Sequence, residues 1–157
     1  MNALALLDLA VTTVPLGIAL VRLANYVNGE LWGRPATVPW AVIFPKAPLV
    51  SGMQVPRHPS QLYAAGMEGI LVFFVAQWMY RRSSSPGLTT AVACIVYGMA
   101  RFVDEFWRQP DLGQPFYWGW MTTGQLLTTP LIIAGFAWTL WHTNQARFKH
   151  ASIQVPE

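Results

Sequence analysis

Charged residues are scarce in this chain of 157 residues. Lysine and arginine together number 10, aspartate and glutamate 7, and charged residues make up only 11%, against 54% hydrophobic residues. Soluble domains carry about 25% charged residues, so the composition excludes a soluble globular enzyme and predicts an integral membrane protein. The net charge is only +3 and the basic residues are scattered, which excludes a nucleic-acid-binding protein.

Cysteine is nearly absent. Cys94 is the sole cysteine and lies within an apolar stretch, so the sequence offers no disulfide framework and no metal-binding cluster, and Cys94 is expected only to pack. A removable signal peptide is not expected either, because the first apolar stretch has no basic leader, carries Asp8 and is not followed by a small-residue cleavage site. No Ser-His-Asp pattern is recognisable.

What the chain does contain is four long apolar stretches. They cover about residues 3–23, 60–80, 88–107 and 121–141, and each approaches the roughly 20 residues that cross a bilayer as a helix. We therefore predict an all-α integral membrane fold with four transmembrane helices in a single membrane domain, residues 1–157.

The segment between the first two predicted helices, residues 33–59, is rich in proline and cannot be a continuous helix. We predict that it forms an external arm. Its apolar, aromatic stretch 38–44 fits either an extended segment on the membrane interface or an ordinary structured loop. At the other end of the chain, residues 142–157 are polar and basic, which predicts a tail at the cytoplasmic leaflet.

The predicted orientation depends on lysine and arginine. Arg81, Arg82, Arg147 and Lys149 lie on one side of the predicted membrane. An equal number lies on the other side, namely Arg34, Lys46, Arg57 and Arg108. Because Arg81 and Arg82 form an acid-free cluster in a short loop, we assign their side to the cytoplasm, which places the arm outside and the C-terminus inside.

Two arginines, Arg22 and Arg101, lie in or near these apolar stretches. A guanidinium at that depth costs about 3 kcal/mol on insertion scales, so it is expected to face a polar interior with partners. Tyr97, Arg101 and Glu105 follow one another at intervals of four residues and share a helical face. The alternative is that Arg101 and Glu105 form only a self-neutralising pair within one helix.

A second polar cluster lies at the end of the first apolar stretch. Arg22 and Asn25 share a helical face there, and Asn28, Gly29 and Glu30 follow. In the simpler interpretation, Asn28 and Gly29 end the helix and Arg22 reaches for the interface. Since arginine binds phosphate through two parallel hydrogen bonds, the two arginines together favour a site for an anionic phospholipid headgroup.

His58 precedes the second predicted helix and adds a titratable imidazole on the same side. It fits either a base at the site or a structural residue beside Pro59.

The run from Arg22 to Arg34, RLANYVNGELWGR, closely resembles the signature of the bacterial prolipoprotein diacylglyceryl transferase family. Further segments of the chain are similar to that family in the same order, from about Pro15 to Pro130. They are RHPSQLY from Arg57, then Tyr97-Gly98 with Arg101-Phe102 and Glu105, then Arg108 with Pro110-Asp111, then Gly124-Gln125.

The resemblance implies transfer of a diacylglyceryl group from phosphatidylglycerol to the lipobox cysteine in the signal peptide of a preprolipoprotein, at the outer face of the inner membrane. It implies no metal and no dissociable cofactor. By similarity, residues at functional positions are Arg22, Asn25, Glu30, Gly33, Tyr97, Arg101 and Glu105. Arg22 and Arg101 are expected on the phosphate and Asn25 orients the headgroup, while Glu30 and Glu105 hold the arginines.

The chain also departs from this family. Family members have about seven spans, and this sequence matches the last four. The first half of family members, which this sequence does not match, contains a His-Gly-Gly loop whose histidine is a plausible proton acceptor. Val21, Ala64 and Thr123 replace the usual glycine, acidic residue and methionine. Three hypotheses follow: a transferase that dimerises or recruits a separate N-terminal half, a non-catalytic remnant that binds anionic lipid, and a small transporter, against which the motif order argues.

Overall fold

The computed structural model describes residues 2–110 and 116–153, with side chains as far as residue 145. Its elements are α1 (Ala3–Ala10), α2 (Val14–Asn28), α3 (Ser60–Ala64), the π-helix η1 (Ala65–Leu71), α4 (Val72–Arg82), α5 (Leu88–Asp104) and α6 (Thr123–Ile153). Among the described residues β-pairing is limited to isolated bridges, so the expected helical class is confirmed there. Within the part of the chain that the structure describes, two segments, Ala3–Asn28 and Ser60–Arg82, are long and apolar enough to cross a membrane.

The first apolar stretch is interrupted where a single helix was expected. Residues 11–13 form turns between α1 and α2. Pro15 lies in the first turn of α2 and has no N–H to donate to the carbonyl of Val11, so a helix cannot continue through this point without losing a hydrogen bond. The side-chain amide of Gln77 on α4 donates to the carbonyl of Thr12 at 3.1 Å, which satisfies one group that the break exposes.

The second apolar stretch is helical throughout but changes its winding. Residues Ala65–Leu71 form a π-helix between the α-helical segments α3 and α4. A π-turn bonds residue i to i+5 and is wider than an α-turn, and such segments are frequent at functional sites. Here the π-helix carries the buried Glu68.

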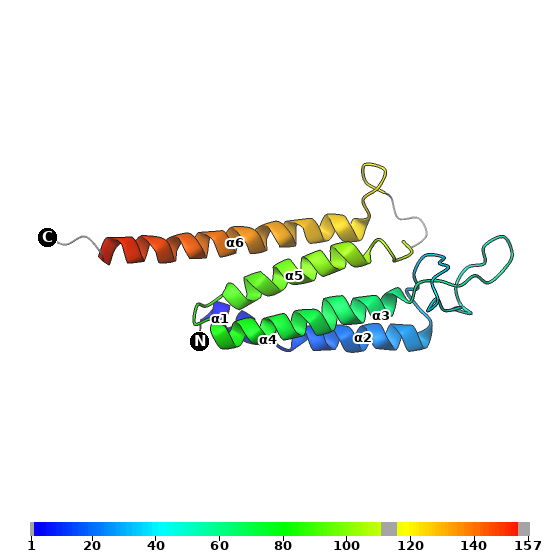
Figure 1. Ribbon diagram of the computed structural model, residues 1–157, viewed down its shortest axis with the longest axis horizontal. Helices are drawn as coiled ribbons and strands as arrows, with labels where there is room; N and C mark the ends of the chain where they lie inside the picture. Colours follow the sequence, from blue (N-terminus) through cyan, green and yellow to red (C-terminus); the bar gives the residue numbers. More distant parts are fainter. Residues whose placement is uncertain (1, 111–115, 154–157) are drawn as a thin grey trace.

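The long helices pack as two antiparallel pairs (Figure 1). The helix α2 lies beside α3, η1 and α4, while α5 packs mainly on α6 and also contacts η1 and α4. The N-terminus, the turn between α4 and α5 and the far end of α6 lie at one end of the molecule, and the arm lies at the other. The stretch expected to be a tail continues α6 as far as Ile153.

The arm, residues 33–59, is folded around a buried arginine. Arg57 pairs its backbone with Val42 in both directions, at 2.9 and 3.0 Å. Its guanidinium donates to the carbonyls of Gly33, at 3.3 Å, and Pro48, at 3.0 Å. The side chain is buried, and burial lowers the pKa of Arg57. The stretch 38–44 is therefore part of a structured loop held to Arg57, with Phe44 buried.

At the opposite end, Asp8 caps α5. The carboxylate of Asp8 accepts hydrogen bonds from the backbone N–H of Gly87, at 2.6 Å, and from the N–H and hydroxyl of Thr90, at 2.8 and 2.7 Å. Gly87 has a positive φ of 88° and no side chain with which to cap the helix itself. A carboxylate at a helix N-terminus stabilises the unpaired N–H groups there, so α1 is fixed to α5.

Candidate anion-binding site

Arg22 on α2 and Arg101 on α5 share one partner, Glu68 on η1. The Nη2 atom of Arg22 lies 2.9 Å from Oε2 of Glu68, and Nη1 of Arg101 lies 3.7 Å from the other carboxylate oxygen, Oε1. Glu68 is fully buried. Three helices thus bring two guanidinium groups to opposite oxygens of one carboxylate.

Arg101 has two further carboxylate partners on its own helix and just beyond its end. Its Nη1 atom lies 2.5 Å from Oε2 of Glu105 and 3.8 Å from Oδ2 of Asp104. The Arg101–Glu105 pair therefore exists, but as part of a network that reaches η1 and α2, and not as an isolated pair on one helix.

A glycine allows α2 and η1 to approach closely enough for this network. A Cβ built at Gly69 would lie 2.5 Å from Cβ of Ala19 and 2.9 Å from its backbone nitrogen. Ala19 is one helical turn from Arg22, and Gly69 is adjacent to Glu68. The backbone contact between Gly69 and Ala19 therefore sets the distance across which Arg22 reaches Glu68.

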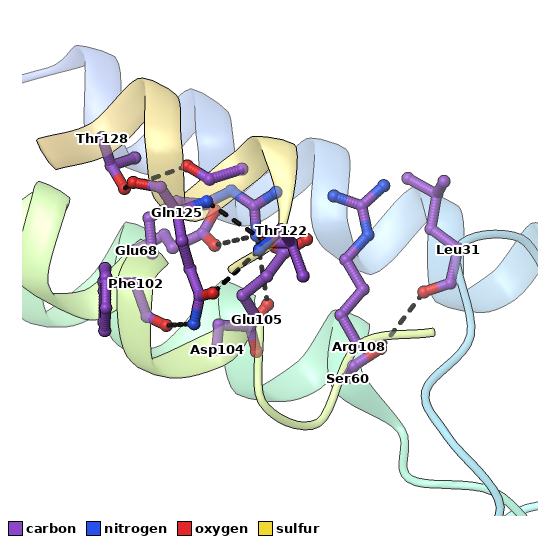
Figure 2. A network of polar contacts seen from close by, with 12 residues as sticks. Leu31, Ser60, Glu68, Phe102, Asp104, Glu105, Arg108, Thr122, Gln125 and Thr128 are labelled. Atoms are coloured by element: carbon purple, nitrogen blue, oxygen red, sulfur yellow. Dashed lines mark hydrogen bonds and ion pairs between the residues drawn. The ribbon is translucent and has the colours of Figure 1, made fainter. Parts of the chain in front are cut away.

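The start of α6 closes the network from another side (Figure 2). Thr122 and Gln125 cap this helix reciprocally: the N–H of Thr122 donates to Oε1 of Gln125 at 3.0 Å, and the N–H of Gln125 donates to the hydroxyl of Thr122 at 3.3 Å. Gln125 also donates to the carbonyl of Phe102 on α5, at 3.4 Å. A Cβ at Gly124 would lie 2.8 Å from Oε2 of Glu105 and 2.9 Å from Nη2 of Arg101, so a larger residue here would have to displace the ends of the paired side chains.

The guanidinium groups are more accessible than their partners. The side chains of Arg22 and Arg101 are 17% and 11% exposed, against 0%, 2% and 6% for Glu68, Asp104 and Glu105. Arginine carries five N–H donors, and the carboxylates occupy only part of them. The arrangement can therefore present preorganised donors to an anion that approaches from the arginine side.

Two other residues expected at the site, Tyr97 and Asn25, lie on the same helices as the two arginines. Tyr97 lies one turn before Arg101 and packs against the buried cluster formed by Val72, Ala76 and Ala93. The backbone carbonyl of Asn25 accepts from the N–H of Glu30 at 2.9 Å, next to Gly29 in the left-handed conformation, as expected for the end of α2.

Three expected residues form a separate group at the root of the arm. Among the described ion pairs, Arg22 is held by Glu68 and not by Glu30, whose backbone carbonyl accepts from Gln61. A Cβ at Gly33 would lie 2.4 Å from the carbonyl oxygen of His58 and 2.8 Å from that of Trp107, so Gly33 is required for close backbone packing. The Nδ1 atom of His58 lies 3.2 Å from the hydroxyl of Tyr63.

Comparison with known proteins identifies the family to which this arrangement belongs. Residues 1–141 match the family described as prolipoprotein diacylglyceryl transferase. The chain belongs to this family. Curated relatives named phosphatidylglycerol–prolipoprotein diacylglyceryl transferase include proteins from Brucella anthropi, 42% identical over 152 residues, and from Brucella ovis and Brucella canis, each 40% identical over 151 residues.

Each of these alignments covers 94% of this chain and 52% of the relative. The chain therefore spans about half the length of the diacylglyceryl transferases that it matches. The resemblance of the motifs from Arg22 to Gln125 is confirmed at the level of the family.

Glu68 and Asp104 were not singled out from the sequence. A lone acidic residue inside an apolar helix is by itself a sign of a functional site, and Glu68 could have been found on that ground. Adjacent side chains on an α-helix point about 100° apart, so Asp104 does not lie on the same helical face as Tyr97, Arg101 and Glu105. It nevertheless reaches Arg101, because residues three apart on a helix are also neighbours.

Proposed function

We propose that this chain takes part in transfer of a diacylglyceryl group from phosphatidylglycerol to the lipobox cysteine of a preprolipoprotein. The observation that supports the proposal is the convergence of Arg22 and Arg101 on Glu68. Two fixed guanidinium groups from different helices suit the phosphate of a phospholipid headgroup.

In this reaction the phosphate is part of the leaving group. The cysteine thiolate attacks the glyceryl carbon that carries the phosphate ester, a C–S bond forms, the C–O bond breaks, and glycerol phosphate leaves with the electron pair of that bond. Negative charge grows on the departing oxygen. Guanidinium donors that are already in place stabilise this charge without reorganisation, an effect typically worth several kcal/mol.

The nucleophile comes from the second substrate, so Cys94 has no part in the proposal. Cys94 lies on α5 beside apolar cavities of about 210 and 200 Å³, and the attacking sulfur must instead reach the arginine side of the network. The thiol needs a proton acceptor. His58 lies beside Tyr63, in the group at the root of the arm. We propose that His58 contributes to binding of the headgroup and that it is not the proton acceptor.

We further propose that the protein lies in the inner membrane with four spans, α1–α2, α3–α4, α5 and α6. The arm and the arginine network would face outward, and the loop with Arg81 and Arg82 would face the cytoplasm. Figure 1 supports the placement of the arm and the basic loop on opposite sides of the membrane, because they lie at opposite ends of the molecule, and the pair Arg81 and Arg82 supports the assignment of the loop to the cytoplasm. A homo-oligomer or a separate chain that supplies the remaining half is the proposed partner.

Growth rescue tests the proposal. Cells depleted of their own diacylglyceryl transferase are supplied with the 157-residue chain, with Arg101→Ala as the matched inactive control and membrane levels of both measured by immunoblot. Rescue by the unmodified chain alone supports the transferase. Failure at full membrane levels refutes activity of the chain on its own, and coexpression with the first half of a Brucella relative then distinguishes a half-enzyme from a non-catalytic lipid-binding protein.

A further inference from the structure

Three side chains at the root of the arm form a hydrogen-bonded series, Trp40–Tyr63–His58. The indole N–H of Trp40, on the arm, donates to the hydroxyl of Tyr63, on α3, at 2.6 Å. The same hydroxyl lies 3.2 Å from Nδ1 of His58. The Tyr63 ring also contacts the rings of His58 and Trp107 edge-on, with centroids 5.8 and 5.7 Å apart. The hydroxyl of Tyr63 therefore links an indole to an imidazole, and ring contacts hold it in place.

The direction of each hydrogen bond in this series follows from the groups themselves. An indole N–H can only donate, whereas a tyrosine hydroxyl has one proton and two lone pairs. Tyr63 therefore accepts from Trp40, and among the described residues the only acceptor for its own proton is Nδ1 of His58. If Nδ1 donated to Tyr63 instead, the hydroxyl proton would have no partner there. The arrangement in which Nδ1 accepts satisfies all three groups.

The backbone of His58 is fixed as well. Its N–H donates to the carbonyl of Arg34, and its carbonyl accepts from the N–H of Gly33, both at 3.0 Å. With Nδ1 accepting from Tyr63, the proton of a neutral imidazole must lie on the other nitrogen, Nε2. Among the described residues Nε2 has no hydrogen bond, and it is not one of the buried atoms without a partner. Nε2–H is therefore a fixed donor that is open to a ligand.

The position of His58 suits the outer part of a lipid headgroup. Ser60, at the start of α3, and Glu68 lie on one continuous helical segment. His58 therefore lies at least about two helical turns farther toward the arm than the carboxylate that holds the arginines. A headgroup whose phosphate lies at the arginines would extend its terminal glycerol toward the arm, and so toward His58.

We infer that His58 acts as a neutral hydrogen-bond donor, presenting Nε2–H to an oxygen of the headgroup, and that Tyr63 and Trp40 are positioning residues that fix this tautomer. The inference rests on the proposed function and names the group through which His58 binds. The oxygen belongs to the phosphate or to the terminal glycerol of phosphatidylglycerol, and both are acceptors. The same arrangement explains why His58 is not the proton acceptor: Nδ1 is engaged by Tyr63, and Nε2 already carries a proton.

The tautomer is tested by ¹⁵N NMR of the 157-residue chain, labelled on histidine and held in phosphatidylcholine nanodiscs. The chain has three histidines, and the signals of His58 are those missing from His58→Gln. At about pH 8 a histidine side chain is ordinarily neutral, and nitrogen–proton couplings within the ring show which nitrogen is protonated. We expect one tautomer, protonated on Nε2. A ring protonated on Nδ1 overturns the inference.

Variants of the two positioning residues show whether they fix the tautomer. Trp40→Phe leaves the Tyr63 hydroxyl free to accept from Nδ1, so His58 should become a mixture of both tautomers. Tyr63→Phe should shift the Nδ1 resonance, because this nitrogen loses its hydrogen bond. Trp78→Phe makes the same change at the other end of the molecule, where Trp78 is 55% exposed against 60% for Trp40, and should leave His58 unchanged.

These signals separate positioning from a merely structural role, which would not alter the protonated nitrogen. If Tyr63→Phe fails to fold, Trp40→Phe still decides the question, because Trp40 is exposed. His58 signals that are identical in Trp40→Phe and in the unmodified chain would contradict the positioning role.

Lipid titration shows what the donor binds. His58→Leu has no donor, whereas His58→Gln keeps an amide N–H. Each is titrated with phosphatidylglycerol and with phosphatidic acid, which lacks the terminal glycerol, in phosphatidylcholine nanodiscs. We expect His58→Leu to bind phosphatidylglycerol about fivefold more weakly, as loss of one neutral hydrogen bond predicts, and His58→Gln to recover most of this affinity.

The two lipids distinguish the two oxygens. Weaker binding of both lipids by His58→Leu places the donor on the phosphate, and weaker binding of phosphatidylglycerol alone places it on the glycerol. Equal affinity of His58→Leu and the unmodified chain for phosphatidylglycerol refutes the donor role while leaving the arginine site in place. If the unmodified chain binds neither lipid, the headgroup assignment of the proposed function fails, and the ligand of His58 fails with it.

Discussion

The guanidinium of Arg22 and the carboxylate of Glu68 lie 2.9 Å apart although 46 residues separate them in the chain. Through Glu68, Arg22 is also linked to Arg101, at 3.7 Å from the other carboxylate oxygen. A buried ion pair is strongly destabilising when one partner is removed, because the other charge stays buried without compensation. The network therefore determines both the packing of three helices and the chemistry of the site.

Glu68→Gln should destabilise the protein by about 3 kcal/mol, the low end of what loss of one partner of a buried ion pair costs. The loss leaves Arg22 without its described carboxylate partner. Thermal unfolding of the purified protein in detergent measures the effect. Gly66→Ala is the matched control, because it lies on the same π-helix and a Cβ there meets nothing within 4 Å. Equal stability of Glu68→Gln and the unmodified chain would contradict the role assigned to this ion pair.

Gly69→Ala should push α2 away from η1, since the new methyl group would overlap with Ala19. Overpacking of this kind costs about 1–3 kcal/mol, and it should also separate Arg22 from Glu68. The same unfolding assay applies, with Gly17→Ala on α2 as a control in open space. If Gly69→Ala unfolds at the same temperature as Gly17→Ala, the close approach of the two helices is not essential.

Arg101→Lys should weaken phosphatidylglycerol binding roughly tenfold, or about 1.4 kcal/mol, because the planar fork of donors becomes a single ammonium. The matched control is Arg82→Lys at the other end of the molecule, where the guanidinium stacks on the Trp78 ring at 5.4 Å. Lipid binding in nanodiscs measures both. Unchanged affinity of Arg101→Lys would remove the headgroup assignment.

Arg57→Ala should loosen the arm without unfolding the helices. The substitution removes hydrogen bonds to the carbonyls of Gly33 and Pro48, and hydrogen bonds from charged groups are worth about 1.5–3 kcal/mol. Limited chymotrypsin digestion should then cleave near the buried Phe44 several-fold faster, while helical circular dichroism is retained. Leu49→Ala, at an exposed position on the same arm, should be cleaved at the original rate. Identical digestion of the two variants would count against Arg57 as the centre of the arm.

Gly124→Ala tests how tightly α6 fits the network. A methyl group there would press on the side-chain ends of Arg101 and Glu105, which can shift more easily than backbone. We therefore expect less than about 1 kcal/mol of lost stability, below the usual 1–3 kcal/mol of overpacking, but weaker binding of phosphatidylglycerol. A stability loss without any change in lipid binding would show that α6 only supports the fold.

Much of the architecture could be predicted from the sequence. Runs of apolar residues located the helices, and the prolines between Gly33 and Pro59 located the arm. The interruption before Pro15 was missed because hydrophobicity continues through it, while the missing N–H acts only on the backbone. The number of spans stays a prediction for α5 and α6, since among the described residues only the segments Ala3–Asn28 and Ser60–Arg82 are long and apolar enough to cross a membrane.

Contacts of the site within one helix could be predicted from the sequence, whereas contacts between different helices could not. Arg101 and Glu105 share a face of one helix, so their pairing followed from the sequence. The partner of Arg22 lies on another helix, and no local pattern relates Arg22 to Glu68. Glu30 was the nearest acidic residue in the sequence, but α2 ends at Asn28 and Gly29 turns the chain away, which leaves Glu30 at the root of the arm.

The π-helical winding of Ala65–Leu71 has a consequence for changes in chain length. Removing one residue from it would favour an ordinary α-turn and rotate everything beyond by about 100°. Either Glu68 would rotate out of the interior, or Val72 and Ala76 of α4 would leave the interior where they are now buried. Deletion of one residue from Ala65–Leu71 should therefore destabilise the protein more than deletion of several exposed residues from the arm. The length of this segment is as constrained as the identity of its residues.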